Sequence, residues 1–142
     1  MLVIDASIAV KWVVEEDGTP EAMALRARGK LIAPDLLIAE CANVLWKKVA
    51  RREFSRDESL IAASLLERTD IELYPMRSLL GAAVRLAIEL DHPAYDCLYL
   101  ACAVRNNCRM VTADARFLQK VSTICNDDIR DRIVPLQKAG SE

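Results

Sequence analysis

The chain has 142 residues, a formal net charge of -2, and 53% hydrophobic against 28% charged residues. This composition supports one domain with a substantial core and excludes a disordered polyelectrolyte. Because the chain as a whole is acidic, any binding of nucleic acid must come from a local basic patch.

Apolar runs that alternate with amphipathic stretches predict short strands separated by helices. Ser7 can cap the first helix, Gly29 is expected to end the second, and Pro34-Asp35 to begin the third. The elements predicted in the first half of the chain are a strand at 2–4, helices from 7 to about 14 and from 19 to about 28, a strand at 31–33, and a long helix from 35 to about 52.

Ser55 and Glu58 have the spacing of a capping box, which predicts a helix from 55 to about 68. The elements predicted after it are a strand at 71–74, helices at 78–90 and 94–105, a strand at 110–112, a short helix from 114, and a strand at 133–134. Strands joined by helical crossovers predict an α/β fold with a central parallel sheet covered on both faces. We expect a single domain over residues 1–139 and a short tail at 140–142.

Four carboxylates lie in apolar surroundings: Asp5 in LVIDAS, Glu40 in LLIAECANVLW, Asp96 in YDCLYLA, and Asp114 in MVTADARF. Ionised acids are costly to desolvate, so four of them brought together predict a bound divalent cation. Asp5 and Asp114 each follow a predicted strand, at the edge of a parallel sheet where ligands bind. The periodicity does not show that the other two acids converge on this edge.

Each acid also has an ordinary structural explanation. Asp5 or Ser7 can cap the first helix, Asp114 can cap the helix after the fourth strand, and Asp96 can complement the positive end of a helix dipole. Glu40 is harder to explain in this way, because Asn43 and Lys47 extend its helix face at three- and four-residue steps.

The five cysteines contain no C-x2-C pair and lie mostly among apolar residues, which is typical of core residues in a reducing compartment. The N-terminal stretch has no basic leader, and charges interrupt every apolar run before it reaches the length of a membrane span. We therefore expect a cytoplasmic protein.

In this order, D-x-S after the first strand, a Glu inside a long helix, Y-D-x-x-Y-L-A, and T-x-D-x-x-F resemble the motifs of PIN-domain nucleases. The length and single-domain layout resemble the VapC-type toxins of prokaryotic toxin-antitoxin pairs. The resemblance covers all but about residues 140–142. It implies a PIN-like three-layer fold and endonucleolytic cleavage of RNA by metal-activated water.

The resemblance further implies that Asp5, Glu40, Asp96 and Asp114 hold Mg2+ or Mn2+. Ser7 and Thr112 are then supporting hydroxyls that orient carboxylates or water, and Asn43 is a further supporting side chain. Relatives often carry another acid beside the final aromatic, where this chain has Arg116-Phe117, so a second tightly bound metal is not predicted.

Basic side chains near these acids are candidates to bind RNA phosphates. They are Lys11, Lys47, Lys48, Arg51 and Arg116. Favourable charge at a helix C-terminus and simple solvation are together the favoured explanation of the cluster at 47–52. Trp12 and Trp46 are expected to pack in the fold or against a partner. His92, four residues before Asp96, invites a general-base role, but a solvent-facing or helix-entry histidine is favoured because the motif does not require it.

The helices at 55–68 and 78–90 carry more apolar residues than a small sheet can cover, which indicates an oligomer or a groove for a partner. The family resemblance implies both a homodimer and a cognate antitoxin. An alternative function is that of a catalytically silent α/β module that binds or regulates a protein. A phosphatase is disfavoured, because LVIDASIAV lacks the D-x-D-x-T nucleophile segment of haloacid-dehalogenase-like enzymes.

Overall fold

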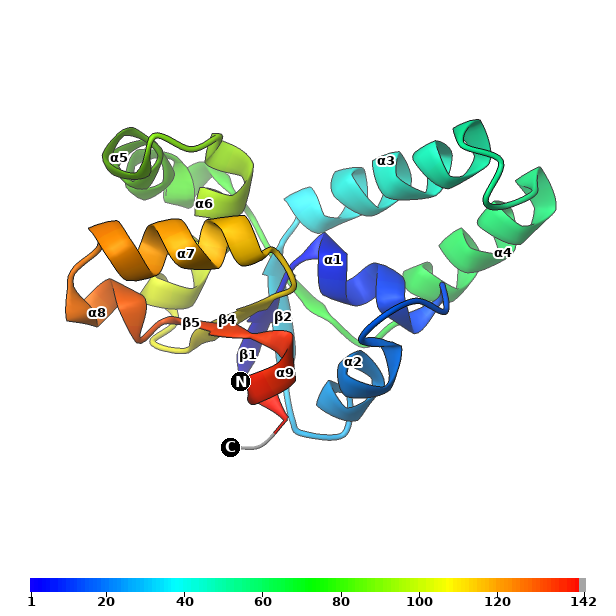
Figure 1. Cartoon of the computed structure of the whole chain (residues 1–142), viewed down its shortest axis with the longest axis horizontal. Coiled ribbons are helices and arrows are strands. Elements are labelled where there is room, and N and C mark those ends of the chain that lie inside the picture. The colour runs from blue at the N-terminus through cyan, green and yellow to red at the C-terminus, as the bar shows by residue number, and fades with distance from the viewer. Residues whose placement is uncertain (141–142) are drawn as a thin grey trace.

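A computed structural model describes residues 1–140 as an α/β fold built on one five-stranded sheet (Figure 1). All four strand pairings are parallel, and the strand order is β3-β2-β1-β4-β5. The strands are β1 (Leu2–Ile4), β2 (Leu31–Pro34), β3 (Glu72–Tyr74), β4 (Arg109–Thr112) and β5 (Ile133–Pro135). The predicted α/β class and parallel sheet are confirmed.

The strand order reverses between β1 and β4. From β1, the strands β2 and β3 extend the sheet in one direction, and β4 and β5 extend it in the other. Val3 pairs with Met110 and Ile4 with Val111, so the next positions in this register are Asp5 and Thr112. Parallel sheets bind ligands at such a reversal, outside the carboxyl ends of the strands. The fold therefore places Asp5 at the expected position for a site.

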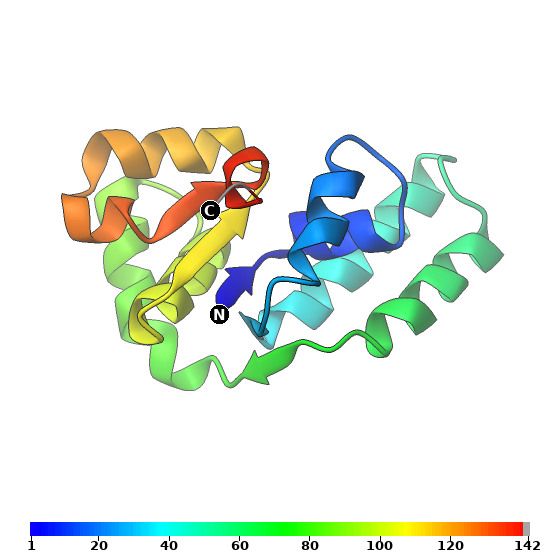
Figure 2. The ribbon, with the colours of Figure 1, turned by 90° about the horizontal axis from the view of Figure 1, so that it is seen from below.

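Helices cover both faces of the sheet and form the outer layers (Figures 1 and 2). Their bounds are α1 (Ala6–Ala9), α2 (Thr19–Leu25), α3 (Leu36–Ala50), α4 (Arg56–Glu67), α5 (Leu80–Leu90), α6 (Ala94–Arg105), α7 (Ala115–Ile124), α8 (Asp127–Arg130) and α9 (Leu136–Ala139), with 3-10 turns η1 (Val10–Trp12) and η2 (Arg77–Leu79). Helix α6 packs on β1, β2 and β4. Helices α5 and α7 lie on its side of the molecule, and α1, α3 and α4 lie on the other.

Local sequence explains most helix ends. The predicted capping box is present: the Ser55 hydroxyl accepts from the Glu58 backbone N–H, and the Glu58 carboxylate accepts from the Ser55 N–H, both at 3.1 Å. Asp91 ends α5 in the left-handed conformation, at φ 47°. Of the two candidate caps of the first helix, Asp5 and Ser7, the structure selects Asp5. Asp5 is the N-cap, and Ser7 donates its hydroxyl proton to the Asp5 carboxylate.

The predicted elements and the structure differ in the short segments. The first helix tightens into a 3-10 turn after Ala9 instead of continuing to about residue 14. Helices α8 and α9 have four residues each and were not predicted, because one helical turn has too few residues to show a period. The predicted tail at 140–142 lies outside the described residues except for Gly140.

The core lies between the sheet and its helices, and its largest fully buried side chains include Tyr99, Phe117, Ile4 and Ile8. All five cysteines are buried and unbonded, which confirms that they are core residues. Within residues 1–140, no helix combines the length and the apolar character that crossing a bilayer requires.

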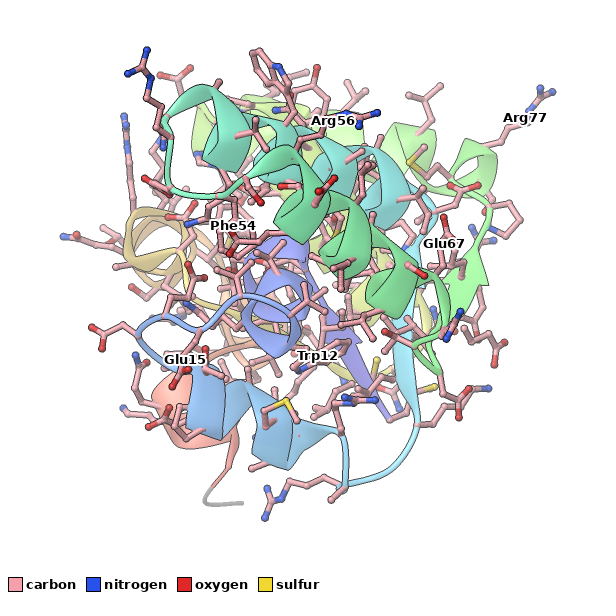
Figure 3. The ribbon with its side chains drawn as sticks, turned by 90° about the vertical axis from the view of Figure 1, so that its right-hand side faces the viewer. Trp12, Glu15, Phe54, Arg56, Glu67 and Arg77 are labelled. Carbon is pink, nitrogen blue, oxygen red and sulfur yellow. The ribbon has the colours of Figure 1, made fainter. Side chains whose placement is uncertain are left out.

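Helices α3 and α4 form an antiparallel pair that projects from one end of the sheet (Figures 1 and 2), and α3 packs beside α1. Trp12, labelled in Figure 3, fixes η1 to α2, because its indole Nε1 donates to Ala22 O at 2.8 Å and the Arg26 guanidinium lies 5.5 Å from its ring centroid. Its packing role is confirmed. Trp46 is 63% exposed, so its role against a partner stays a prediction.

Candidate active site

Asp5 is the most buried acid of the chain's candidate site, at 4% exposure. Its Oδ1 accepts from the Ser7 hydroxyl at 2.5 Å and from the Ile8 backbone N–H at 3.2 Å. Its Oδ2 accepts from the Thr112 hydroxyl at 2.5 Å. These three donors fix both carboxylate oxygens at the end of β1.

The ends of β1 and β4 are joined by hydrogen bonds that involve the same two hydroxyls. Thr112 Oγ1 accepts from the Asp114 backbone N–H at 3.1 Å, and Ser7 Oγ accepts from the Ala113 N–H at 3.2 Å. Asp114 then caps α7, since its Oδ1 accepts from the Phe117 N–H at 3.1 Å. Asp114 is therefore a helix cap, which was the ordinary structural role expected for it. The Thr112 hydroxyl also links it to Asp5.

Glu40 and Asp96 come from two helices whose N-terminal ends overhang this edge. Glu40 lies in the second turn of α3 and is half-buried. Asp96 lies in the first turn of α6, and its Oδ2 is 2.7 Å from His92 Nε2. Tyr99, one turn further along α6, is fully buried with its hydroxyl close to the Glu40 carboxylate.

All four acids line one cavity of about 530 Å³ at the switch point of the sheet. Periodicity alone left this convergence open. The side chains around the cavity come from the ends of β1 and β4 and from α1, α3 and α6. They are Asp5, Ala6, Ser7, Leu36, Ala39, Glu40, Asn43, Val44, Lys47, Tyr95, Asp96 and Asp114. Thr112 is fully buried and reaches the site through its hydrogen bond to Asp5.

Burial, together with the charge of Asp96, raises the proton affinity of Asp5 and of Glu40. Burial raises the pKa of Asp5 from 3.8 to about 6, with a smaller contribution from the charge of Asp96, although the Ser7 and Thr112 hydroxyls oppose the shift. Burial and Asp96 also raise the pKa of Glu40, and the nearby Tyr99 hydroxyl acts in the opposite direction. Clustered, partly buried carboxylates of this kind are stabilised by a cation.

The donor set fits a hard divalent cation. Carboxylate oxygens are the ligands that Mg2+ and Mn2+ prefer, and Mg2+ keeps several waters, so direct and water-mediated contacts together suffice. Within residues 1–140, no three Asp, Glu, His or Cys side chains stand close enough to ligate one ion directly. An ion in this cavity would therefore be held by some of the acids through water or after a change of rotamer. Burial is the main cause of the raised pKa of Asp5, and an ion in the cavity would favour the ionised form of this carboxylate.

The candidate RNA-binding side chains differ in whether protein groups already engage their charge. Lys47 lines the cavity, and Arg51 and Arg116 are exposed but do not line it. Lys11 and Lys48 are engaged with protein groups. Lys11 Nζ lies 3.2 Å from Glu16 Oε1 and donates to Asp17 O at 2.6 Å, and Lys48 Nζ contacts Glu16 and Glu53 at 3.4 and 3.0 Å.

These contacts compete with phosphate, so the structure disfavours Lys11 and Lys48 relative to Lys47 as RNA ligands.

Several residues of the site were not singled out by the motifs. Of the two placements expected for His92, entry into a helix is confirmed, since α6 begins two residues later, but the side chain does not face solvent: it is only 9% exposed and contacts Asp96. The four-residue spacing of His92 and Asp96 was the available signal. Tyr95 and Tyr99 belong to the Y-D-x-x-Y-L-A motif, but the motif does not tell which tyrosine faces the cavity and which is buried beside Glu40.

The chain is similar to known proteins over most of its length. A family model described as the PIN domain matches residues 2–122. Ribonuclease VapC3 of Pyrobaculum aerophilum is 30% identical over 125 residues, which cover 84% of this chain and 93% of the relative. Ribonuclease VapC9 of Mycobacterium tuberculosis is 32% identical over 116 residues, which cover 82% and 87%.

Among solved structures, PAE2754 from Pyrobaculum aerophilum has a TM-score of 0.73 to this chain at 20% sequence identity. The superposition covers 99% of this chain and 92% of that one. At this level of identity the likeness shows a shared fold.

Proposed function

Because the chain belongs to the PIN domain family, we propose that it is a Mg2+- or Mn2+-dependent endoribonuclease, the toxin of a type II toxin-antitoxin pair. The observation that carries the proposal is the convergence of Asp5, Glu40, Asp96 and Asp114 on one cavity at the switch point of the sheet. The ribonuclease names of the relatives support RNA as the substrate. The likeness of the fold to PAE2754 supports the architecture alone.

The four acids have distinct roles in this proposal. Asp5, held on both oxygens by Ser7, Thr112 and the Ile8 N–H, is the rigid ligand at the base of the cavity. Glu40, Asp96 and Asp114 complete the acidic set directly or through water. When bound, the ion lowers the pKa of a water molecule and neutralises negative charge that develops on the phosphodiester during in-line attack.

The α3 face holds the RNA backbone at the mouth of the cavity. Asn43 and Lys47 follow Glu40 at three- and seven-residue steps, and both line the cavity. Lys47 supplies positive charge to a phosphate, and Asn43 supplies amide hydrogen-bonding groups. The exposed Tyr95 ring, beside Asp96, is available to stack on a base of a single-stranded loop.

The partners and location follow from the same assignment. Exposed apolar side chains on α3 and α4 and on α5 provide surfaces for a homodimer and for a cognate antitoxin, in a cytoplasmic protein. Those on α3 and α4 are Ile38, Trp46, Leu60, Ile61 and Leu65, and those on α5 are Leu80, Val84 and Ile88. A single functional domain over residues 1–139 is part of this proposal.

The test is RNA cleavage by the purified protein. EDTA is expected to abolish cleavage, and Mg2+ or Mn2+ to restore it. Asp5→Asn and Asp96→Asn are expected to lose at least about 100-fold in kcat, as for loss of a group on which transition-state stabilisation depends. Asp70→Asn is the matched control, because Asp70 is exposed and does not line the cavity.

Cleavage that persists in EDTA, or full activity in both site variants, would contradict the proposal. A catalytically silent binding module would instead leave RNA intact under every metal condition.

A further inference from the structure

His92 lies in the loop between α5 and α6 and is the chain's single histidine. Its backbone is fixed: its N–H donates to Ala87 O at 3.1 Å, and the preceding Asp91 is in the left-handed conformation. Lys120 of α7 donates to Asp91 O at 2.7 Å and ties this loop to the neighbouring helix. The ring therefore stands on a rigid backbone at the entrance of α6.

Two contacts fix the orientation of the imidazole ring. It packs against the Phe117 ring, with centroids 4.8 Å apart and an interplanar angle of 32°. His92 Nε2 lies 2.7 Å from Asp96 Oδ2. Nδ1 is buried and has no hydrogen-bond partner among the described residues. Because an ionised carboxylate only accepts hydrogen bonds, the proton between the two side chains belongs to Nε2.

This geometry rules out the general-base role that the spacing of His92 and Asp96 suggested. His92 does not line the cavity that the four acids line. One ring nitrogen is engaged by Asp96 and the other is buried beside an aromatic ring. Neither nitrogen can take a proton from water in the cavity.

Phe117 connects this arrangement to the other side of the site. Its backbone N–H donates to Asp114 Oδ1 at 3.1 Å, while its ring supports His92. One buried residue thus helps to fix two of the four acids, Asp114 directly and Asp96 through His92. This gives a physical reason for the aromatic residue of the T-x-D-x-x-F motif.

We propose that His92 is a positioning residue for Asp96: its Nε2–H donates to Oδ2, fixes the carboxylate plane, and leaves Oδ1 as the oxygen available to the cation. The inference rests on the proposed metal-dependent function and assigns His92 a part in metal binding. Hydrogen-bonded partners that orient metal ligands typically change metal affinity by roughly 10- to 100-fold when they are replaced.

Two substitutions of His92 separate orientation from packing. His92→Leu keeps an apolar contact with Phe117 but has no donor, whereas His92→Gln places an amide N–H near the position of Nε2. Mn2+ affinity is measured from the electron paramagnetic resonance signal of free Mn2+ during titration. His92→Leu is expected to weaken Mn2+ binding roughly 10- to 100-fold, and His92→Gln to recover most of the loss. The KM for RNA is expected to change by less than about twofold in both, since His92 touches no substrate.

A second measurement on the unmodified protein does not depend on the folding of any variant. Two-bond correlations between ring nitrogens and ring carbon-bound protons report where the imidazole proton lies, and one histidine gives one set of signals. In the Mg2+-loaded protein a proton on Nε2 is expected. A neutral ring protonated only at Nδ1 would overturn the inference, whether or not His92→Leu folds.

The outcomes distinguish this inference from the proposed function. If the unmodified protein neither binds Mn2+ nor cleaves RNA, the proposed function fails and the inference fails with it. If it does both and His92→Leu binds Mn2+ equally well, only the positioning role is overturned. Equal losses of kcat in His92→Gln and His92→Leu at unchanged Mn2+ affinity would also overturn it, because they would indicate a chemical role for the ring.

Discussion

Thr112, at the end of β4, donates its hydroxyl proton to the carboxylate of Asp5, at the end of β1, although 107 positions separate the two residues. The same Thr112 oxygen accepts from the Asp114 N–H. One fully buried hydroxyl therefore connects two of the four acids across the point where the strand order reverses.

Thr112→Val removes this hydroxyl with little change of shape. The variant leaves a buried Asp5 oxygen and the Asp114 N–H each without a partner, which is expected to lower the free energy of unfolding by about 1 to 3 kcal/mol. Urea unfolding at pH 8 measures the change. Thr112→Ser retains the hydroxyl and is expected to stay within about 1 kcal/mol of the unmodified protein. Equal stability of the Val and Ser variants would show that the hydrogen bond contributes nothing.

The raised pKa of Asp5 predicts a stability that depends on pH. Asp5 binds its proton more tightly in the folded protein, at a pKa of about 6 against an ordinary value of 3.8. Its contribution to the free energy of unfolding is therefore present at low pH and is lost as pH rises through about 4 to about 6, by about 3 kcal/mol in total.

Asp5→Asn lacks this titration. In EDTA, the difference in free energy of unfolding between Asp5→Asn and the unmodified protein is expected to shift in favour of the variant between pH 4 and pH 7, by up to about 3 kcal/mol. Other carboxylates titrate in both proteins, so the difference isolates Asp5. A difference that does not change with pH would contradict the assignment.

The Tyr99 hydroxyl is buried and has no hydrogen-bond partner among residues 1–140, although it lies near the Glu40 carboxylate. Tyr99→Phe removes only this hydroxyl, so it is expected to leave stability unchanged or to raise the free energy of unfolding by about 1 kcal/mol. Chemical denaturation in EDTA checks this. A loss of more than about 1 kcal/mol would show instead that Tyr99 donates a hydrogen bond to Glu40.

Lys47 and Lys48 are neighbours on α3 with different surroundings, and each is the control for the other. Lys47 lines the cavity, whereas Lys48 contacts Glu16 and Glu53. Lys47→Gln is expected to weaken RNA binding severalfold and to reduce the slope of log affinity against log salt by about 0.7, as for one lost phosphate contact on a single strand.

Lys48→Gln is expected to leave this slope unchanged. Fluorescence anisotropy of a labelled RNA at several salt concentrations measures both variants. Equal effects of the two substitutions would contradict the assignment of Lys47 to the RNA path.

The sequence predicts those features that depend on local patterns. The capping box of Ser55 and Glu58, the long helix α3 and the parallel sheet follow from spacing and periodicity, and Asp5 and Asp114 follow strands that the pattern identifies. The positions of these two acids at one edge then follow from the rule for parallel sheets.

Other features depend on contacts between distant segments, which a local pattern does not contain. Whether Lys48 is available to RNA depends on Glu16, 32 positions away. The burial of His92 depends on Phe117, which arrives from α7. Asp5 and Ser7 are both good candidates to cap the first helix, and only the hydrogen bonds at the end of β4 explain why Asp5 takes the position.

The central claim is that the four acids jointly bind one divalent cation, and crystals soaked in Mn2+ test it most directly. The account predicts an anomalous difference peak in the cavity between Asp5, Glu40, Asp96 and Asp114, at about 2.0 to 2.3 Å from at least one carboxylate oxygen, with bound water bridging to the others. An empty cavity at a Mn2+ concentration that saturates RNA cleavage, or a peak only at a distant site, would contradict it.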